Sequence, residues 1–421
     1  MSDKQLFSSL ELADHEVRLI VGEFFNSRIN ILTVERVKCD GVSFDSITDP
    51  KNVIEAITVA RENVKKKLGA SVNKVILAIP SYKMKRFGFQ SKVDITGIDN
   101  LVTIQDVREA LNKANAVEVS NEYAVVQATP IKYTANGIST RRIPLGDKCK
   151  QLAVDIDLLC NNRDFTYEVV TCVEKAGLEI LDIFLDIYAI AKEAALFEQS
   201  IDKQIVVLKV GRSATVLGLL KQGRYTTSTI LGAGIGNIAS ALSEEYGLAS
   251  EVSADLLKYN VRLDGDKWST NPVHIWNDES ETRTLSEEEL ANCVKNNLEL
   301  WLDAVEKTCV PILQAGETTV IITDEGGETE GLDVLVQKRL NVETKYYIPD
   351  TLGARNASLT CPLGLLYAYQ DKLDILGKGA DSIDMDAFVK TVSYRDKKTN
   401  TKEDTLTNKL RGLFTDGRKS S

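Results

Sequence analysis

Residues 205–224 read IVVLKVGRSATVLGLLKQGR. An apolar run at Ile205–Leu208 is followed by turn residues, a second apolar run at Thr215–Leu220 and a reversal at Lys221–Arg224, which is the pattern of a strand, a turn and a returning strand. A similar pattern of two strands around a turn opens the chain about 195 residues earlier. The recurrence indicates a duplicated α/β fold in which a hairpin begins each half.

The first half of the chain alternates strand and helix patterns. Glu11–Val21 mixes apolar with charged residues and Ile29–Val34 is a second apolar run, so together they predict a hairpin. Apolar residues three or four positions apart predict a helix of about four turns between Pro50 and Gly69. Val75–Ile79 is a short apolar run of the kind found in buried parallel strands. The predicted order is strand, strand, helix, strand.

A region of different character interrupts this half from Lys83 onward. It opens with basic residues and continues with helix and strand patterns, which together predict a small inserted α/β module. The expected elements are a helix near Thr103–Ala114 and strands around Tyr123–Ala128 and Leu152–Leu159. After the module we expect a helix at Phe165–Ala176, an extended segment at Glu179–Leu185 and a helix at Ala189–Phe197.

Composition excludes several classes of function. The chain has 421 residues, of which 43% are hydrophobic, and this is enough for two or three folded domains and too apolar for a disordered protein. A net charge of -10 argues against a protein that grips nucleic acid over a wide surface. The two histidines, His15 and His274, are too few for a histidine metal centre and offer little to a catalytic triad.

The cysteines and the amino terminus indicate the compartment. Seven cysteines, an odd number without a Cys-x-x-Cys pair, favour a reducing cytosolic compartment over a disulfide framework or a zinc ribbon. The segment Met1–Gln5 is polar and lacks the apolar core of a signal peptide. No uncharged apolar run reaches the length of about 18 residues that a membrane span needs. We therefore expect a protein that is neither secreted nor membrane-spanning.

Short motifs in a consistent order connect the chain to a known family. Between about residues 10 and 376 they are Leu10-Glu11-Leu12-Ala13, Val21-Gly22-Glu23, Asn121-Glu122-Tyr123, Ile143-Pro144-Leu145-Gly146, Val173-Glu174-Lys175-Ala176-Gly177-Leu178, Glu330-Gly331-Leu332 and Pro362-Leu363-Gly364-Leu365-Leu366. In order and spacing the chain resembles FtsA, the bacterial cell-division homologue of actin. The resemblance implies an α/β, actin-like fold of two ribonuclease-H-like halves, with a small α/β subdomain inserted into the first half.

The resemblance also implies a domain organisation. The first-half core is expected at residues 1–82, 166–200 and 354–376, with the inserted subdomain at 83–165. The second-half core is expected at 201–228 and 313–353, with its smaller lobe at 229–312. A flexible linker is expected at 377–404, followed by an amphipathic helix at 405–421.

Proteins of this superfamily hold ATP between two glycine-rich hairpin turns and a Gly-Gly loop, because glycine lets backbone N–H groups approach the ligand closely. The resemblance places these loops at Glu11, Ala13 and Asp14, at Gly211, Arg212 and Ser213, and at Asp324, Glu325, Gly326 and Gly327. Both aspartates expected in the second hairpin are missing, and acids replace small or neutral residues elsewhere. The sequence therefore predicts no catalytic residue and no metal ligand.

Two interpretations of these loops remain open. In the first, the fold has lost ATP hydrolysis and ATP binding, because acidic side chains would face phosphate. These acids are Asp14, Glu16, Asp324 and Glu325. A like-charge contact near 4 Å costs about 1 to 4 kcal/mol, and a micromolar complex has only about 8 kcal/mol of binding free energy. In the second, Lys209 and Arg212 restore phosphate binding, and ATP with magnesium acts as a switch without fast hydrolysis.

A partner surface is implied by the resemblance alone. In the family, the smaller lobe of the second half binds the carboxyl-terminal tail of the tubulin-like ring protein FtsZ. The long helix expected here at Ser286–Val310 has an apolar stripe that we interpret as core. Its members are Leu290, Val294, Leu298, Trp301, Leu302 and Val305. Beside the stripe, the resemblance assigns partner binding to Lys295, which would hold an acidic peptide weakly and in a salt-sensitive manner.

The carboxyl-terminal residues have a pattern of their own. A polar run through Arg395–Asp404 precedes Leu406, Leu410, Leu413 and Phe414, which recur at helical spacing. Four basic residues and one acid accompany them, so the local charge is +3. Because the family has a membrane-targeting helix at this place, the resemblance assigns membrane binding to Leu406, Lys409, Leu410, Arg411, Leu413 and Phe414. A frayed tail, or one that docks on its own body, is the alternative.

These features predict an FtsA-like adaptor at the cytoplasmic face of the cell membrane, at the division site. It would self-associate into filaments and tether the FtsZ ring without hydrolysing ATP. Its partners would be the FtsZ carboxyl-terminal tail, an anionic membrane surface and further copies of itself, but not nucleic acid. The alternatives are an actin-like ATPase filament that depends on its nucleotide, and a related pilus or compartment scaffold.

Overall fold

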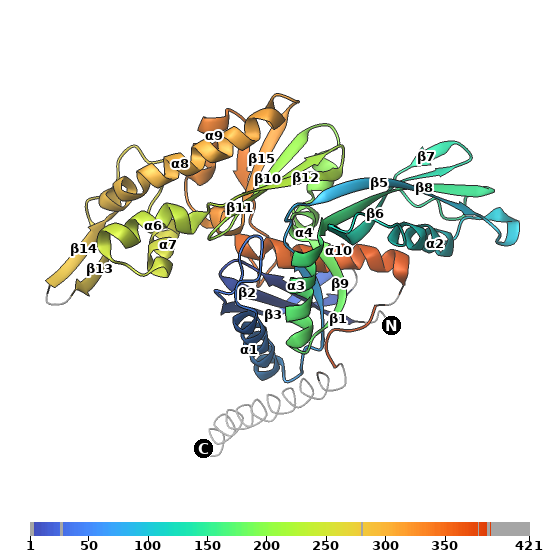
Figure 1. Cartoon of the computed structure of the whole chain (residues 1–421), viewed down its shortest axis with the longest axis horizontal. Coiled ribbons are helices and arrows are strands. Elements are labelled where there is room, and N and C mark those ends of the chain that lie inside the picture. The colour runs from blue at the N-terminus through green and yellow to red at the C-terminus, as the bar shows by residue number, and fades with distance from the viewer. Residues whose placement is uncertain (1–3, 26–27, 279–280, 378, 385–387, 389–421) are drawn as a thin grey trace, which may run out of the picture.

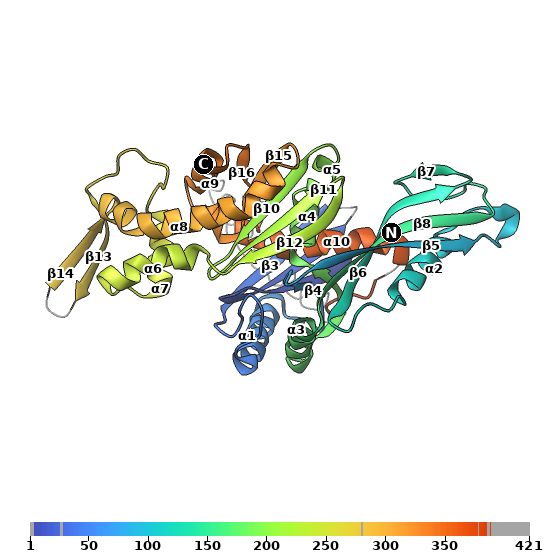
Figure 2. The same cartoon turned by 45° about the horizontal axis from the view of Figure 1, so that its top comes forward.

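The computed structural model describes residues 4–25, 28–278, 281–377, 379–384 and 388. Two five-stranded sheets form the centre of the molecule, and a four-stranded sheet extends from them on one side (Figure 1). A two-stranded hairpin with three helices extends on the other side. A second view shows these two extensions at opposite ends of the long axis (Figure 2).

The first central sheet has the strand order β3-β2-β1-β4-β9. Strand β1 pairs antiparallel with β2 and parallel with β4, and β4 pairs parallel with β9. Helices α1 and α3 cover one face, and α10 packs on the other with α4 beside it. The bounds are β1 Gln5–Leu12, β2 Glu16–Phe25, β3 Arg28–Lys38, α1 Pro50–Leu68, β4 Lys74–Ile79, α3 Arg163–Lys175, β9 Glu179–Leu185, α4 Asp186–Glu193, α5 Leu196–Gln199 and α10 Thr360–Leu376.

Helix α1 begins and ends at residues that the sequence marks clearly. The Asp49 carboxylate accepts hydrogen bonds from the backbone N–H groups of Lys51 and Asn52, at 3.0 and 3.2 Å, and so caps the first turn. Pro50 occupies the first helical position, where no N–H is needed. Gly69 ends the helix with φ of 76°, a left-handed conformation that glycine adopts without strain. The predicted helix is confirmed.

The second central sheet repeats the order of the first, as β12-β11-β10-β15-β16. Strand β10 pairs antiparallel with β11 and parallel with β15, which matches the pairing of β1 with β2 and β4. The bounds are β10 Gln204–Val210, β11 Thr215–Lys221, β12 Arg224–Leu231, β15 Thr318–Thr323, η2 Asp324–Glu328, α9 Leu332–Leu340, β16 Thr344–Tyr346 and η3 Ala357–Leu359. The duplication predicted from residues 205–224 is confirmed.

The inserted sheet is antiparallel, with the order β5-β8-β6-β7, and α2 packs on it. It has a hydrophobic core of its own that includes Val107, Leu152 and Val154. The bounds are β5 Lys85–Asp94, η1 Ile98–Asn100, α2 Ile104–Asn115, β6 Tyr123–Ala135, β7 Ile138–Thr140 and β8 Gln151–Asn162.

The extension at the opposite end belongs to the second half and has α8 as its longest element. Ser286 caps α8 by accepting a hydrogen bond from the Glu289 N–H, and the Glu289 carboxylate accepts one from the Ser286 N–H in return. The six residues of the predicted apolar stripe are all buried, so their interpretation as core is confirmed. The bounds are α6 Ile235–Tyr246, α7 Ser250–Tyr259, β13 Pro272–Asp278, β14 Glu281–Ser286 and α8 Glu287–Leu313.

The prediction of one strand over Glu11–Val21 is wrong. The chain turns at residues 13–15 and divides this segment between β1 and β2. The first half therefore opens with three antiparallel strands, and its order is strand, strand, strand, helix, strand. Charged residues on both sides of the turn, Glu11 and Arg18, obscured the break because they occupy buried strand positions.

Three elements differ in extent from the sequence prediction. The basic stretch after Lys83 contains β5, an edge strand whose mostly exposed side chains form no apolar run. Strand β6 continues to Ala135 rather than ending near Ala128. The helix expected at Ala189–Phe197 is divided into α4 and α5 at Ala195, which has φ of 50°. The predicted tail helix at 405–421 lies outside the described residues.

Candidate functional site

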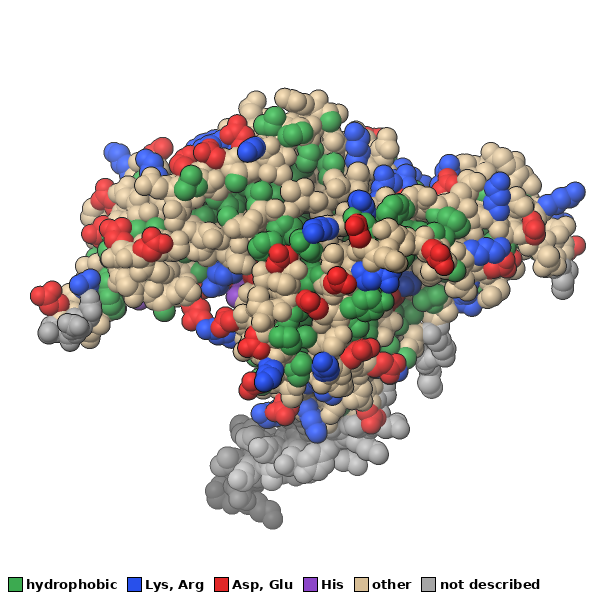
Figure 3. Space-filling model, in the orientation of Figure 1, with side chains coloured by type: hydrophobic (Ala, Val, Ile, Leu, Met, Phe, Trp, Pro, Cys, Tyr) green, Lys and Arg blue, Asp and Glu red, His purple; other side chains and the backbone are tan. Residues whose placement is uncertain are grey.

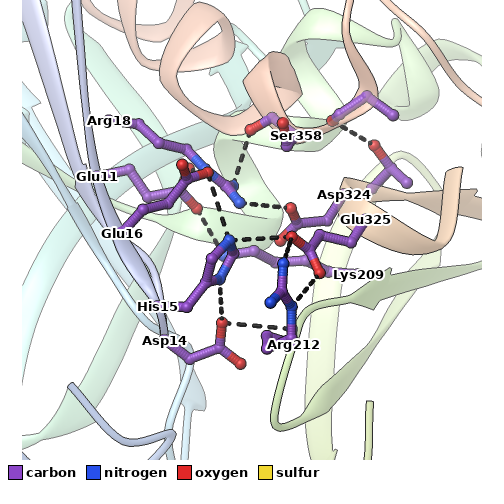
Figure 4. A network of polar contacts seen from close by, with 12 residues as sticks. Glu11, Asp14, His15, Glu16, Arg18, Lys209, Arg212, Asp324, Glu325 and Ser358 are labelled. Carbon is purple, nitrogen blue, oxygen red and sulfur yellow. Dashed lines mark hydrogen bonds and ion pairs between the residues drawn. The ribbon is translucent and has the colours of Figure 1, made fainter. Parts of the chain in front are cut away.

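Three loops meet between the two halves of the molecule, and their charged side chains form one network (Figure 4). The turn between β1 and β2 carries Asp14 and His15, and the turn between β10 and β11 carries Arg212. The segment after β15 begins with Asp324 and Glu325. Because β10 and β15 are parallel neighbours, the loops at their carboxyl ends lie together at one edge of the sheet. We call these contacts the interlobe network.

Lys209 on β10 connects the second half to the first. Its ammonium group forms ion pairs with Glu11 at 2.7 Å and with Asp186, at the start of α4, at 2.9 Å. Burial opposes a charged lysine, but Asp186 and Glu11 outweigh that cost and raise the pKa of Lys209 well above its ordinary value. Lys209 is therefore a charged side chain already neutralised by two carboxylates.

Arg18 on β2 is completely buried and contacts three acids. Its Nε donates to Glu16 at 2.6 Å, and its Nη1 donates to Glu11 at 3.1 Å. Its Nη2 forms an ion pair with Asp324 at 2.9 Å, which again joins the two halves. Nη1 also donates to the backbone carbonyl of Ser358 at 2.8 Å. The fork of the guanidinium group thus holds strands β1 and β2 against the loop after β15.

His15 lies between acids from both halves. Its Nδ1 is 3.0 Å from Asp14, and its Nε2 is 2.9 Å from Glu325. Burial favours the neutral ring, but the contacts with Asp14 and Glu325 prevail and raise the pKa of His15 to about 9. Arg212 holds the same Glu325 with two hydrogen bonds of 2.8 Å. Glu325 is fully buried and is paired with His15, with Arg212 and, at 3.6 Å, with Lys258.

Asp14 makes contacts that an anion would make in a phosphate-binding hairpin. One carboxylate oxygen accepts a hydrogen bond from the Arg212 backbone N–H at 3.3 Å. The other accepts from the Ser213 N–H at 2.5 Å and the Ser213 hydroxyl at 2.8 Å. Burial would raise the pKa of Asp14, but the bonds from His15 and Ser213 lower it to about 2. An ionised side chain of the first half therefore occupies the N–H groups of the second-half turn.

Little space remains between the loops. The cavity beside Asp14, Lys209, Gly211 and Asp324 has a volume of about 50 Å³. A water molecule takes about 30 Å³ of liquid, whereas small-molecule sites have roughly 300 to 1,000 Å³. In this conformation the cavity is too small for a nucleotide.

The glycines of the third loop face protein atoms. A Cβ atom on Gly326 would lie 2.5 Å from the Cβ of Val210, and one on Gly327 would lie 2.8 Å from the Cβ of Ala357. Close packing against β10 at Gly326 and against Ala357 at Gly327 therefore requires glycine at both positions, whether or not a ligand binds beside them.

The contacts in the structure bear on both interpretations of the loops, the loss of ATP binding through acidic side chains and the restored phosphate binding through Lys209 and Arg212. Asp14, Asp324 and Glu325 do not face an open phosphate site, because each is paired with a cation or with N–H donors of the chain. The two cations expected to restore phosphate binding, Lys209 and Arg212, are paired with carboxylates of the chain itself.

Four members of the network were not identified as site residues by the sequence analysis. They are His15, Arg18, Asp186 and Lys258, the last of which lies 3.6 Å from Glu325. Arg18 offers a usable signal, because a basic residue in the apolar run Val17–Val21 has to find acids in the core. Asp186 and Lys258 have no such local signal.

The remaining predicted residues lie away from the network. Lys295 is exposed on α8 and has no ion pair with any residue that the structure describes. The residues predicted to bind a membrane, Leu406 to Phe414, lie outside the described residues. Within the described ranges, no helix is long and apolar enough to cross a membrane, and no group of three or more His, Cys, Asp or Glu side chains is placed to hold a metal ion.

Comparison with known proteins shows which family this chain is similar to. A family model described as the SHS2 domain inserted in FtsA matches residues 83–160, the region of the inserted sheet. Over most of the chain, the sequence is similar to the cell division protein FtsA of Bacillus subtilis (strain 168), with 22% identity over 376 residues, 87% of this chain and 84% of that protein. The FtsA of Enterococcus hirae is 24% identical over 379 residues, 86% of this chain and 82% of that protein. The chain therefore carries the inserted domain of FtsA and is similar to FtsA proteins over most of its length.

Solved structures confirm the predicted actin-like fold of this chain. The PilM-PilN type IV pilus biogenesis complex matches with a TM-score of 0.57 and 12% identity, over 85% of this chain and 97% of that chain. MreB5 of Spiroplasma citri bound to ADP matches with a TM-score of 0.51 and 12% identity, over 89% of this chain and 99% of that chain. At these identities the likeness concerns the fold alone.

Proposed function

We propose that this protein is an adaptor that tethers the FtsZ ring to the cytoplasmic face of the cell membrane at the division site, and that it does so without a bound nucleotide. It would bridge partners and self-associate rather than catalyse a reaction. The observation that carries the proposal is the interlobe network, and above all the carboxylate of Asp14 on the backbone N–H groups of Arg212 and Ser213.

The network supplies the contacts that a nucleotide would otherwise supply between the halves. In the superfamily, phosphate oxygens accept hydrogen bonds from both hairpin turns and so hold the halves together. In this chain Asp14 of the first half accepts them from the second-half turn, and Lys209 pairs with Glu11 and Asp186 across the same gap. The halves therefore have an internal connection that requires neither ATP nor magnesium.

ATP would have to displace this connection before it could bind. Its phosphates would compete with Asp14 for the Ser213 N–H and with Glu325 for Arg212. Each displaced carboxylate would then lie close to phosphate, at a cost of about 1 to 4 kcal/mol per contact near 4 Å. A few such contacts remove most of the roughly 8 kcal/mol of a micromolar complex.

Equilibrium dialysis with labelled ATP and magnesium tests the nucleotide part of the proposal. We expect no stoichiometric binding at micromolar ATP, while a nucleotide-binding actin-fold protein in the same experiment gives one equivalent. A one-to-one complex with this chain that is lost in the Lys209→Ala variant would overturn the proposal, because it would place the nucleotide between the halves.

Reconstitution tests the tethering part. We expect a fluorescent peptide of the FtsZ carboxyl-terminal tail to be recruited to anionic liposomes only when the full-length protein is present. Lys295→Glu should reduce peptide binding, whereas Lys66→Glu, a similarly exposed change on α1, should not. Phe414→Asp should reduce pelleting with liposomes and leave peptide binding intact. Equal recruitment by all variants would contradict the assigned surfaces.

A further inference from the structure

A second cavity lies outside the interlobe network, where the inserted sheet meets both halves. Its volume is about 630 Å³, within the range of roughly 300 to 1,000 Å³ that is usual for small-molecule sites. Strands β6 and β8 and the segment after β7 contribute from the inserted sheet, α4 and α5 from the first half, and the β11–β12 turn from the second half. Figure 3 shows that Lys and Arg side chains gather on the surface around this junction.

One wall of the cavity is a fixed ion pair between the inserted sheet and the second half. Asp157 on β8 is buried and accepts two hydrogen bonds from Arg224 on β12, one of them at 2.8 Å. Arg86 on β5 donates to the same carboxylate at 3.2 Å. Arg224 is therefore neutralised and positioned, and it serves as a rigid wall rather than as a free ligand.

Two further arginines line the cavity and form no ion pair with any described residue. Arg141 and Arg142 follow β7, are exposed, and have neither a side-chain ion pair nor a side-chain hydrogen bond with any part of the chain that the structure describes. The Arg141 guanidinium group reaches the β11–β12 turn, since a Cβ atom on Gly223 would lie 3.4 Å from its Nη1. Glu198, the other acid of the lining besides Asp157, is exposed on α5. The mouth of the cavity thus has an excess of positive charge in a protein of net charge -10.

Another part of the lining is aromatic. The rings of Tyr188 and Phe197 lie with their centroids 4.9 Å apart, and Leu159 on β8 is also part of the lining. Lys192 lies over the Phe197 ring at 5.6 Å and is paired with Asp371 at 2.6 Å, so its charge is already compensated. A ligand in this cavity would meet two aromatic rings, inclined by 51° to one another, and two guanidinium groups that form no ion pair with any described residue.

We propose that this cavity binds a small organic phosphate ester with an aromatic body, whose phosphate is held by Arg141 and Arg142 and whose ring packs against Tyr188 and Phe197. Guanidinium groups match phosphate oxygens with paired, charge-assisted hydrogen bonds. Aromatic surfaces bind planar rings in stacked or edge-on arrangements. Occupancy would add a second connection between the inserted sheet and the β11–β12 turn, beside the pair of Arg224 with Asp157.

The test uses phenyl phosphate as the probe, because it carries both required features and is too small to bridge the interlobe network. Isothermal titration calorimetry on the full chain should give one site, and inorganic phosphate should bind at least tenfold more weakly because it lacks the ring. The double variant Arg141→Ser/Arg142→Ser should weaken phenyl phosphate at least tenfold, which is about 1.4 kcal/mol. The matched variant Lys148→Ser/Lys150→Ser removes two exposed charges from the same sheet and should leave the affinity unchanged.

Hydrogen exchange locates the bound probe. Phenyl phosphate should slow amide exchange at residues 138–142 and 221–225 in the parent chain and not in the arginine variant. Both arginines are exposed and have no side-chain partner among the residues that the structure describes, so thermal unfolding of the variant should match that of the parent. Equal affinity of phenyl phosphate and inorganic phosphate, or equal affinity of the parent and the arginine variant, would overturn the proposal.

Discussion

Replacement of Arg18 by methionine is the sharpest test of the interlobe network. Methionine keeps an unbranched chain of similar length but removes every donor and the positive charge. In the parent, Arg18 is completely buried and joins Glu11 and Glu16 of the first half to Asp324 of the second. The variant therefore leaves three buried carboxylates without the cation that they share.

The expected loss can be worked out acid by acid. Glu11 keeps Lys209 at 2.7 Å, and Glu16 keeps Arg36 at 2.7 Å. Asp324 has no other ion pair among the described residues, so it becomes an uncompensated buried charge. Removal of one partner from a buried ion pair typically costs 3 to 5 kcal/mol, so we expect Arg18→Met to lower the free energy of unfolding by about 3 to 5 kcal/mol.

This loss should depend on pH in a defined direction. Burial, only partly offset by Arg18 and Lys209, already raises the pKa of Asp324 to about 6. Without Arg18 the pKa of Asp324 rises further, and a carboxyl whose native pKa is raised loses stability as pH increases through that value. The difference between variant and parent should therefore be largest at pH 7.5 and above, and smaller at pH 5.5, where Asp324 takes up a proton.

Urea unfolding followed by tryptophan fluorescence measures the effect, and two variants provide controls. Arg36→Met removes an arginine from the same Glu16, but its side chain is about a third exposed, so its loss should be about 1 kcal/mol or less. In the Arg18→Met background, Asp324→Asn should recover part of the stability, because asparagine removes the unpaired charge and tolerates the φ of 63° at this position. Equal losses for Arg18→Met and Arg36→Met, or a loss for Arg18→Met that does not change between pH 5.5 and 7.5, would refute the reasoning.

Two further predictions concern the histidine and the packing of the first half. The native pKa of His15 is raised to about 9 from 6.5. Its contribution to the free energy of unfolding is therefore complete below pH 6.5 and is lost as pH rises through 9, to an upper limit of about 3 kcal/mol. Chemical unfolding of the parent between pH 7 and 10 should show this decline in stability, and unfolding of His15→Gln should not. Gly364→Ala on α10 would place a Cβ atom 1.8 Å from the carbonyl oxygen of Ala189, so this variant should have a lower thermal unfolding midpoint. Gly88→Ala is the control, because its Cβ atom would meet no atom within 4 Å, and it should leave the midpoint almost unchanged.

Local pattern was sufficient for elements whose stabilising contacts are close in sequence. The helix between Pro50 and Gly69, the β10–β11 hairpin and the buried stripe of α8 all follow from spacing and capping residues within about 30 positions. Prediction failed at β1, β2 and β5. Glu11 and Arg18 contact each other, but their further partners Lys209 and Asp324 come from the second half. In the edge strand β5, Phe87, Phe89 and Val93 are separated by glycine or polar residues, so there is no continuous apolar run.

The sequence by itself determined the duplicated hairpins, the inserted module and the family resemblance, and it showed that acids had replaced small residues in the nucleotide loops. Only the tertiary structure decided what those acids do. Asp14 meets Ser213, and Glu325 meets His15, across separations of about 200 and 310 residues. A carboxylate repels a phosphate but neutralises a cation, and its effect therefore depends on which group the fold places within about 3 Å of it. Spacing along the chain carries no information about a neighbour that distant.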